Sequence, residues 1–167
     1  GKTALVTGGA TGIGRMAAEG LAVAGARVLI ASRKAEACEA AAAEINALGL
    51  PGRAEGFRGD VANEDGVAAL TAEVRRRCPG GLAILVNNAG RAWGAPLGSF
   101  PFQAWEKVMS LNVAGLFSLT QALLPDLRRA ASPQDPARVI NIASVMGEQP
   151  LGDGAYSYAA SKAAVVH

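Results

Sequence analysis

The first 25 residues join a short apolar run, a glycine-rich turn and an apolar helical stripe without any spacer. Residues 3–7 (TALVT) are mostly apolar, as expected for a strand that is buried on both faces. The turn at residues 8–14 (GGATGIG) leads into apolar residues at the spacing of one helix face, and Gly25 ends that pattern. A strand, a glycine turn and a helix in this order let backbone N–H groups approach a pyrophosphate at the helix N-terminus. A tight turn that binds nothing would use the same residues.

The same alternation of strand and helix continues along the chain. The later strands are apolar, which is typical of a parallel sheet that helices cover on both faces. We therefore expect an α/β fold with a three-layer, doubly wound parallel sheet (a Rossmann fold), with residues 1–167 forming a single NAD(P)-binding domain. Further strands are expected at 27–31, 53–59, 82–86 and 138–143, and helices at 34–48, 63–77 and 102–129.

Composition excludes several classes of partner. Half of the 167 residues are hydrophobic, the formal net charge is +2, and no basic cluster is interleaved with aromatic residues, so nucleic acid is not expected. The two cysteines, Cys38 and Cys78, indicate neither a metal site nor a secreted disulfide framework. The longest apolar stretch, 108–125, carries polar residues, which favours a buried helix over a membrane span. The expected location is the cytoplasm.

The end of the second expected strand indicates which dinucleotide is bound. In this fold an acidic side chain at that point would bond the ribose 2′-hydroxyl of NAD. Here the residues are Ser32 and Arg33, and a guanidinium can hold a 2′-phosphate with its planar fork. The sequence therefore favours NADP(H) over NAD(H). The alternative is that Arg33 simply begins the next helix and faces solvent.

Tyr158 and Lys162 are four residues apart in a helical pattern, which places them on one face of that helix. A neighbouring ammonium group favours the phenolate form of a tyrosine, and such a phenol can exchange a proton with an alcohol or carbonyl oxygen. An exposed tyrosine beside an unrelated lysine would have the same spacing. What favours the site is that Asp60, the 87–90 stretch (NNAG) and Ser144 also follow expected strands, at the edge where ligands bind.

Taken in order, these motifs resemble the short-chain dehydrogenase/reductase family. The family's TGxxxGxG turn matches residues 7–14, and its NNAG motif matches residues 87–90. The family's active-site residues match Asn112, Ser144, Tyr158 and Lys162, whereas Tyr156 has an alanine four residues later. The resemblance extends over the whole chain, and bacterial β-ketoacyl reductases are similar in the stretches 87–109 and 124–142.

The resemblance implies a role for each matching residue. Tyr158 would be the general acid/base, Lys162 would favour its phenolate and hold the nicotinamide ribose, and Ser144 would bond the substrate oxygen. Asn112 would hold a water that relays protons, although its amide could instead satisfy a local backbone group. Thr11 stands where NADPH-preferring members can carry a basic residue, so Arg33 would select the phosphate alone. The implied cofactor contacts are Gly8, Thr11, Gly12, Ile13, Gly14, Ser32, Arg33, Asp60, Val61, Asn87, Ala89, Gly90, Tyr158 and Lys162.

The expected activity is NADP(H)-dependent interconversion of a carbonyl and a secondary alcohol, with a 3-oxoacyl thioester as the favoured substrate. A sugar, polyol or steroid dehydrogenase of the same family and a non-catalytic NADP-binding module remain as alternatives. The loop 145–155 would line the substrate pocket. Its substrate contacts would be Met146, Gln149 and Leu151, together with Ser144 and Tyr158, with no metal.

Members of the family continue beyond the point that corresponds to His167, with a further strand, a segment that covers the substrate and a final strand. We therefore expect the C-terminal part of the fold to be missing from this chain. We also expect a homo-oligomer, a dimer or tetramer, through the 102–129 helix and the helix that starts near 156. The middle of the 102–129 helix is apolar nearly all round, which indicates burial on several sides.

Overall fold

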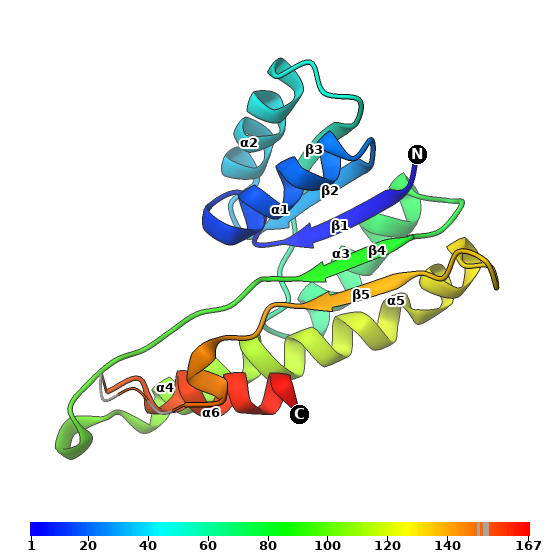
Figure 1. Ribbon diagram of the computed structural model, residues 1–167. Coiled ribbons are helices and arrows are strands. Elements are labelled where there is room, and N and C mark those ends of the chain that lie inside the picture. The colour runs from blue at the N-terminus through cyan, green and yellow to red at the C-terminus, as the bar shows by residue number, and fades with distance from the viewer. Residues whose placement is uncertain (150, 152–153) are drawn as a thin grey trace.

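Five parallel strands form the sheet of the computed structural model, which describes residues 1–149, 151 and 154–167. Their spatial order is β3-β2-β1-β4-β5 (Figure 1). The strand order reverses between β1 and β4, and such a reversal opens a crevice at the carboxyl ends of the two strands. The strands are β1 (Thr3–Thr7), β2 (Arg27–Ser32), β3 (Arg53–Arg58), β4 (Ile84–Asn87) and β5 (Arg138–Asn141).

Helices cover both faces of the sheet, so the three-layer parallel α/β fold expected from the sequence is confirmed (Figure 1). The two covering layers use different side chains: mostly alanines join α1 and α2 to the strands, and leucines join α3 and α5 to the opposite face. The helices are α1 (Gly12–Val23), α2 (Ala35–Ala47), α3 (Glu64–Arg77), α4 (Phe102–Met109), α5 (Leu116–Ala130) and α6 (Tyr156–Val166), with short helical turns η1 (Leu97–Ser99), η2 (Ser110–Gly115) and η3 (Val145–Gly147).

The central strand β1 explains how one run of apolar residues supports both layers. Successive side chains of a strand point to opposite faces of the sheet. Ala4 and Val6 accordingly join the cluster under α1 and α2, while Leu5 joins the cluster under α3 and α5, and all three are fully buried. The strand is therefore held from both sides, and its carboxyl end is fixed where the glycine turn begins.

The predicted long helix over 102–129 is confirmed, but its middle is not α-helical. The chain is helical from Phe102 to Ala130, but η2 is a π-helix between α4 and α5. A π-turn accommodates extra residues within a helix and is frequent at functional sites. In η2 it buries Asn112 and Gly115, and a Cβ added to Gly115 would overlap the carbonyl oxygen of Val61. Close packing against the loop after β3 accompanies the change of helix type.

By length and composition the helical run Phe102–Ala130 could cross a membrane. In the structure, however, it packs against α3, and buried Asp126 on α5 is paired with Arg75 at 2.9 Å and with Arg129 at 2.9 Å. A carboxylate that is 2% exposed and held by two guanidinium groups is typical of a helix that packs against the core of a folded domain. We therefore interpret this run as a core helix.

Strand β5 forms one edge of the sheet and is exposed on both faces. Val139 and Ile140, which point to opposite faces, are 42% and 44% exposed, whereas the residues of the neighbouring strand β4 are buried. Two exposed β-branched residues on an edge strand leave apolar surface uncovered within this chain.

Candidate active site

The glycine turn is fixed by hydrogen bonds between the ends of β1 and β4. The Thr7 hydroxyl accepts from the backbone N–H groups of Asn88 at 3.1 Å and Ala89 at 3.0 Å. The Asn88 side-chain amide donates to the carbonyl oxygens of Thr7 at 2.9 Å and Gly8 at 3.1 Å. These bonds tie the two strands together at the reversal of strand order, so the turn is positioned by residues 80 positions away in the sequence.

Three glycines of the turn are required by its geometry. Gly8 and Gly12 have φ values of +64° and +54°, in the left-handed region that other residues rarely adopt. A Cβ added to Gly14 would overlap the Gly8 carbonyl oxygen and the Asn88 amide, so α1 can approach the turn only with glycine there. The helix begins at Gly12 with no side-chain cap on Thr11, which leaves its first backbone N–H groups available to an anion.

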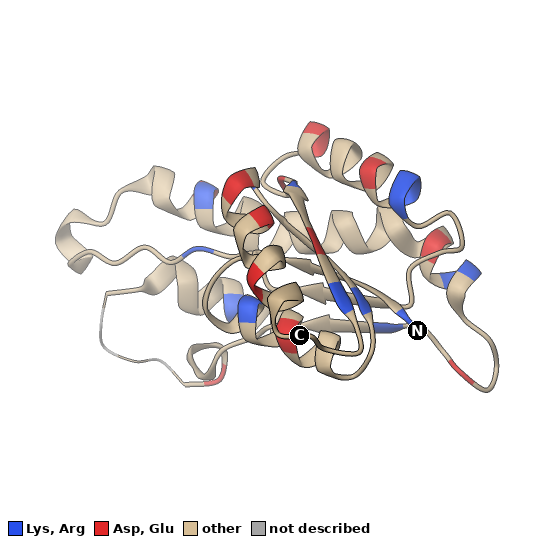
Figure 2. Ribbon diagram, turned by 90° about the horizontal axis from the view of Figure 1, so that it is seen from above, with Lys and Arg blue, Asp and Glu red and all other residues tan. Residues whose placement is uncertain are grey.

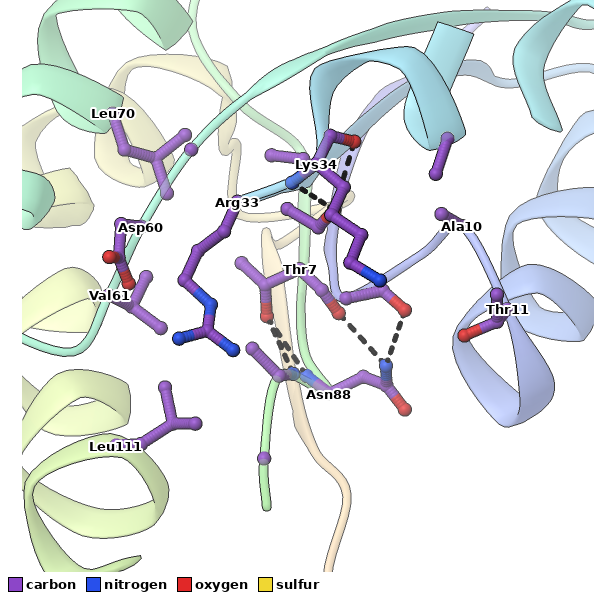
Figure 3. A pocket seen from close by; sticks show the side chains of 17 residues that line it. Thr7, Ala10, Thr11, Arg33, Lys34, Asp60, Val61, Leu70, Asn88 and Leu111 are labelled. Carbon is purple, nitrogen blue, oxygen red and sulfur yellow. Dashed lines mark hydrogen bonds between the residues drawn. The ribbon is translucent and has the colours of Figure 1, made fainter. Parts of the chain in front are cut away.

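A cavity of about 390 Å³ opens between this turn and the ends of β2 and β3. We call it the β1–β2 cavity (Figure 3). Arg33 and Lys34 extend into it from the end of β2, and Asp60 and Val61 face it from the loop after β3. Of the predicted cofactor contacts, those that line it are Gly8, Thr11, Ser32, Arg33, Asp60, Val61, Ala89 and Gly90.

Ser32 lines this cavity, and its predicted contact with the cofactor stays a prediction. Its hydroxyl accepts from the backbone N–H of Lys34 at 3.2 Å and donates to the carbonyl oxygen of Lys34 at 3.3 Å. The buried thiol of Cys38 donates to the Ser32 hydroxyl oxygen at 3.1 Å. The hydroxyl is thus committed to the protein, and it shapes the turn that presents Arg33.

A second cavity of about 250 Å³ lies beside α6, and we call it the α6 cavity. It is lined by Ile13 from α1 and by Tyr158 and Lys162 from α6, and it shares Asn88 and Gly90 with the β1–β2 cavity. The two cavities are therefore neighbours that together extend from Arg33 to Tyr158, and we call the pair the trough. This brings together residues that are 125 positions apart in the sequence, at the edge where the strands end.

Tyr158 and Lys162 lie on the same face of α6, as their spacing predicts. The Lys162 ammonium is 5.7 Å from the centre of the Tyr158 ring and donates to the carbonyl oxygen of Ile142 at 2.6 Å. Burial lowers the pKa of Lys162 from its ordinary value, because the charged form loses hydration. The bond to Ile142 fixes the ammonium at the end of β5 and beside the phenol.

The Asn112 amide is hydrogen-bonded within the protein through both its oxygen and its nitrogen. Its oxygen accepts from the Arg91 backbone N–H at 2.9 Å, and its nitrogen donates to the Arg91 carbonyl and to the Ser161 hydroxyl, each at 2.9 Å. Ser161 in turn donates to the Tyr158 carbonyl oxygen at 2.7 Å. The amide thus satisfies backbone groups of Arg91, and the water relay that the resemblance implies stays a prediction.

Ser144 is the N-cap of η3, and its hydroxyl accepts from the Met146 backbone N–H at 3.3 Å. Met146 is half-buried, whereas Gln149 and Leu151 are exposed, and neither described cavity is lined by them. Residues 150, 152 and 153 of the loop 145–155 lie outside the described residues. The substrate contacts assigned to this loop stay predictions.

Asn87 and Asn88 follow one another at the end of β4, but their amides bond different parts of the protein. Asn87 was predicted to contact the cofactor, but its buried amide donates to Thr120 on α5 and Asn141 on β5, both at 2.9 Å. Asn88, which was not selected, holds the glycine turn and lines both cavities. The sequence reasoning also missed Lys34 and Ser161. Lys34 could have been found, because lysine is unusual at the N-cap of a helix, whereas no local signal distinguishes Ser161.

A known protein family matches almost the whole chain. Residues 2–167 match the family model described as short chain dehydrogenase. The chain therefore belongs to the short-chain dehydrogenase family, and the resemblance drawn from the TGxxxGxG, NNAG and YxxxK motifs is confirmed.

Individual relatives cover almost all of this chain. The rhamnolipids biosynthesis 3-oxoacyl-[acyl-carrier-protein] reductase of Pseudomonas aeruginosa is 51% identical over 99% of the chain, and gluconate 5-dehydrogenase of Gluconobacter oxydans is 38% identical over 99%. The solved Pseudomonas aeruginosa RhlG/NADP active-site complex has a TM-score of 0.93 at 50% identity over 99% of the chain. The chain spans only 63%, 61% and 63% of the lengths of these three proteins, respectively.

Proposed function

We propose that the protein is an NADP(H)-dependent oxidoreductase that interconverts a carbonyl and a secondary alcohol. The observation that carries this proposal is the trough, which runs from Arg33 past the glycine turn to Tyr158 and Lys162. A dinucleotide has phosphate at its centre and a nicotinamide at one end, and the trough offers an anion-binding turn between two distinct ends.

The β1–β2 cavity fits the adenosine half of NADP(H). Positive-φ glycines and the uncapped start of α1 leave room and donors for a pyrophosphate. Val61 and Leu111 line an apolar part of the wall that suits an adenine, and Arg33 projects toward it (Figure 3). No acid stands at the end of β2, so a 2′-phosphate would meet a cation there. The solved NADP complex of the Pseudomonas aeruginosa relative supports the same choice.

The α6 cavity supplies the proton chemistry of the proposed reaction. When bound, the nicotinamide supplies hydride transfer, which is the cofactor's own chemistry. Tyr158 would donate a proton to the carbonyl oxygen, or accept one from the alcohol, while Ser144 would hold that oxygen by a second hydrogen bond. Lys162 is fixed by Ile142 and would favour the tyrosinate and orient the ribose. The two hydroxyl donors act on charge that develops on the substrate oxygen.

A 3-oxoacyl thioester is the substrate class that we favour. Relatives of this chain are named 3-oxoacyl-[acyl-carrier-protein] reductases. Large apolar side chains are also exposed on η1, on α4, on η3 and in the loop before α6, and they would suit an acyl chain. These side chains are Leu97, Phe102, Val145 and Leu151. A polyol or sugar acid is the second candidate, because gluconate 5-dehydrogenase is 38% identical.

We propose further that the protein works in the cytoplasm as a homo-oligomer that pairs along α4, α5 and α6. Exposed aromatic side chains on these helices, including Phe117 at 66% exposure and Trp105 at 36%, support an interface of this kind. Light scattering during gel filtration would test it. A monomer at micromolar concentration would contradict it.

The function is tested by a screen of NADPH oxidation with acetoacetyl and longer 3-oxoacyl thioesters, together with 5-keto sugar acids and steroid ketones. We expect turnover with the thioesters and a higher kcat/KM as the acyl chain lengthens. Turnover with sugar acids alone would support the second candidate. NADPH binding without turnover on any of these ketones would instead support the non-catalytic module.

A further inference from the structure

Lys34 occupies a position that its own helix disfavours. Helix α2 begins at Ala35, so Lys34 is its N-cap, and the lysine side chain makes no capping bond. Helices favour Ser, Thr, Asp or Asn at this position, since an oxygen there accepts from the free N–H groups of the first turn. A cation is also unfavourable next to the positive end of the helix dipole. Conflicts of this kind occur where a residue serves a function other than folding.

The backbone of Lys34 is nevertheless held firmly. The Ser32 hydroxyl bonds both its N–H and its carbonyl oxygen, and the buried Cys38 thiol donates to that hydroxyl. The lysine side chain extends into the β1–β2 cavity in the direction of Thr7 and Ala10, whereas Arg33 points toward Val61 and Leu111 (Figure 3). The same short turn thus sends two cations toward different sides of one cavity.

Many of the basic residues in the part of the chain that the structure describes form ion pairs, but these two cations do not. Arg27, Arg75 and Arg77 form ion pairs, and acidic and basic positions are interspersed in the view of Figure 2. Neither Arg33 nor Lys34 has an ion pair within the described ranges. The one acid among the residues that line the cavity is Asp60, whose carboxylate accepts from the Ala62 N–H at 3.0 Å. The cavity therefore has an excess of positive charge that suits a dianion.

We propose that Lys34 is a second residue for the 2′-phosphate and that it determines specificity together with Arg33. This inference rests on the proposed use of NADP(H). Lys34 would supply a cation on the glycine-turn side of the cavity. The family can carry a basic residue at the position of Thr11, but threonine is uncharged. A phosphate monoester has a charge of about −1.5 to −2 at neutral pH, so it would neutralise both cations and relieve the unfavourable charge at the N-terminus of α2.

The test compares two ligands that differ only in the 2′-phosphate, adenosine 2′,5′-bisphosphate and 5′-AMP, by isothermal titration calorimetry. Neither ligand requires turnover or a nicotinamide. Lys34→Gln should weaken the bisphosphate about tenfold and 5′-AMP less than about twofold, because one charge-assisted contact is lost. Lys107→Gln removes the same charge from an exposed position on α4 and should change neither affinity.

A further variant excludes misfolding as the cause. Lys34→Asp supplies a good N-cap, so it should raise Tm by about 2–4 °C while it weakens the bisphosphate more than Lys34→Gln does. An equal loss for both ligands in Lys34→Gln would show a general attraction of nucleotides and overturn the proposal. So would an unchanged ratio of the two affinities. A wild-type protein that binds both ligands equally overturns the proposed NADP(H) preference as well as the role of Lys34.

Discussion

The two ends of the trough hold their polar groups in opposite ways. At the β1–β2 cavity, Arg33 and Lys34 extend into open space with no ion pair among the residues that the structure describes. At the α6 cavity, Lys162 lines the wall, and Asn112 and Ser161 lie behind it, bonded to lining residues. All three are buried and hydrogen-bonded within the protein. The first end is thus arranged to gain a charged ligand, and the second holds its geometry before any ligand arrives.

This difference has an energetic consequence. Removing an exposed, unpaired charge costs the fold little, so loss of the Arg33 or Lys34 charge alone should change affinity rather than stability. Removing a member of a buried hydrogen-bond network leaves its partners unsatisfied, which costs about 1–3 kcal/mol for each group. Substitutions near α6 should therefore change stability and turnover together. Tyr158, which exchanges the proton, is the exception, because its substitution should change turnover alone. The predictions below test this contrast from the largest effect to the smallest.

Tyr158→Phe should reduce kcat by about 10²–10⁴-fold, because the general acid/base is removed. The dissociation constant of NADPH, measured by fluorescence titration, should change less than about twofold. Tyr156→Phe is the matched control: this tyrosine is two residues away, is 39% exposed and packs its ring edge against Phe100. Near-normal turnover in Tyr158→Phe would remove the tyrosine from the mechanism.

Gly14→Ala should lower the free energy of unfolding by about 1–3 kcal/mol, because the new Cβ would overlap the Gly8 carbonyl oxygen. Gly20→Ala, in the same helix, has open space around its Cβ and should raise that free energy by about 0.5–1 kcal/mol. Urea denaturation of both variants measures the difference. Equal stabilities would mean that α1 does not need its close approach to the glycine turn.

Ser161→Ala should lower the free energy of unfolding by about 1–2 kcal/mol, because the Asn112 amide loses an acceptor in a buried site. It should also reduce kcat severalfold without changing NADPH affinity, since Ser161 bonds the backbone of Tyr158. Ser110→Ala, at an exposed position in η2, serves as the control. A Tm equal to that of the control would show that the bond to Asn112 contributes nothing to the fold.

Lys162→Met should alter how stability depends on pH. Burial lowers the pKa of Lys162 in the folded protein below its ordinary value of 10.5. At a pH between the lowered pKa of the folded state and the ordinary pKa of the unfolded state, the unfolded chain binds more protons than the folded one. This lysine therefore makes the free energy of unfolding rise with pH. Urea denaturation from neutral pH to 10.5 should show this rise in the wild type and in the exposed-site control Lys107→Met, but not in Lys162→Met. A rise that persists in Lys162→Met would assign it to other groups.

Patterns of apolar residues were sufficient to predict the parallel sheet and its covering helices, and the spacing of glycines was sufficient to predict the glycine turn. The alternation in β1 and the spacing of Tyr158 and Lys162 follow from the geometry of a strand and a helix, which any local segment obeys. Asn87 and Asn88 show where this reasoning ends. Neighbouring residues at the end of a strand point to opposite sides, so a difference of one position decides which amide holds the glycine turn.

By itself, then, the sequence determined the family, the order of the elements and the edge of the sheet at which the site lies, because these depend on local periodicity and on short motifs. Only the tertiary structure decided that Lys34 enters the β1–β2 cavity, that Asn112 bonds Arg91 and Ser161, and that the helix changes to a π-helix at η2. Each of these depends on contacts between segments that are distant in the chain, and no local pattern encodes their direction.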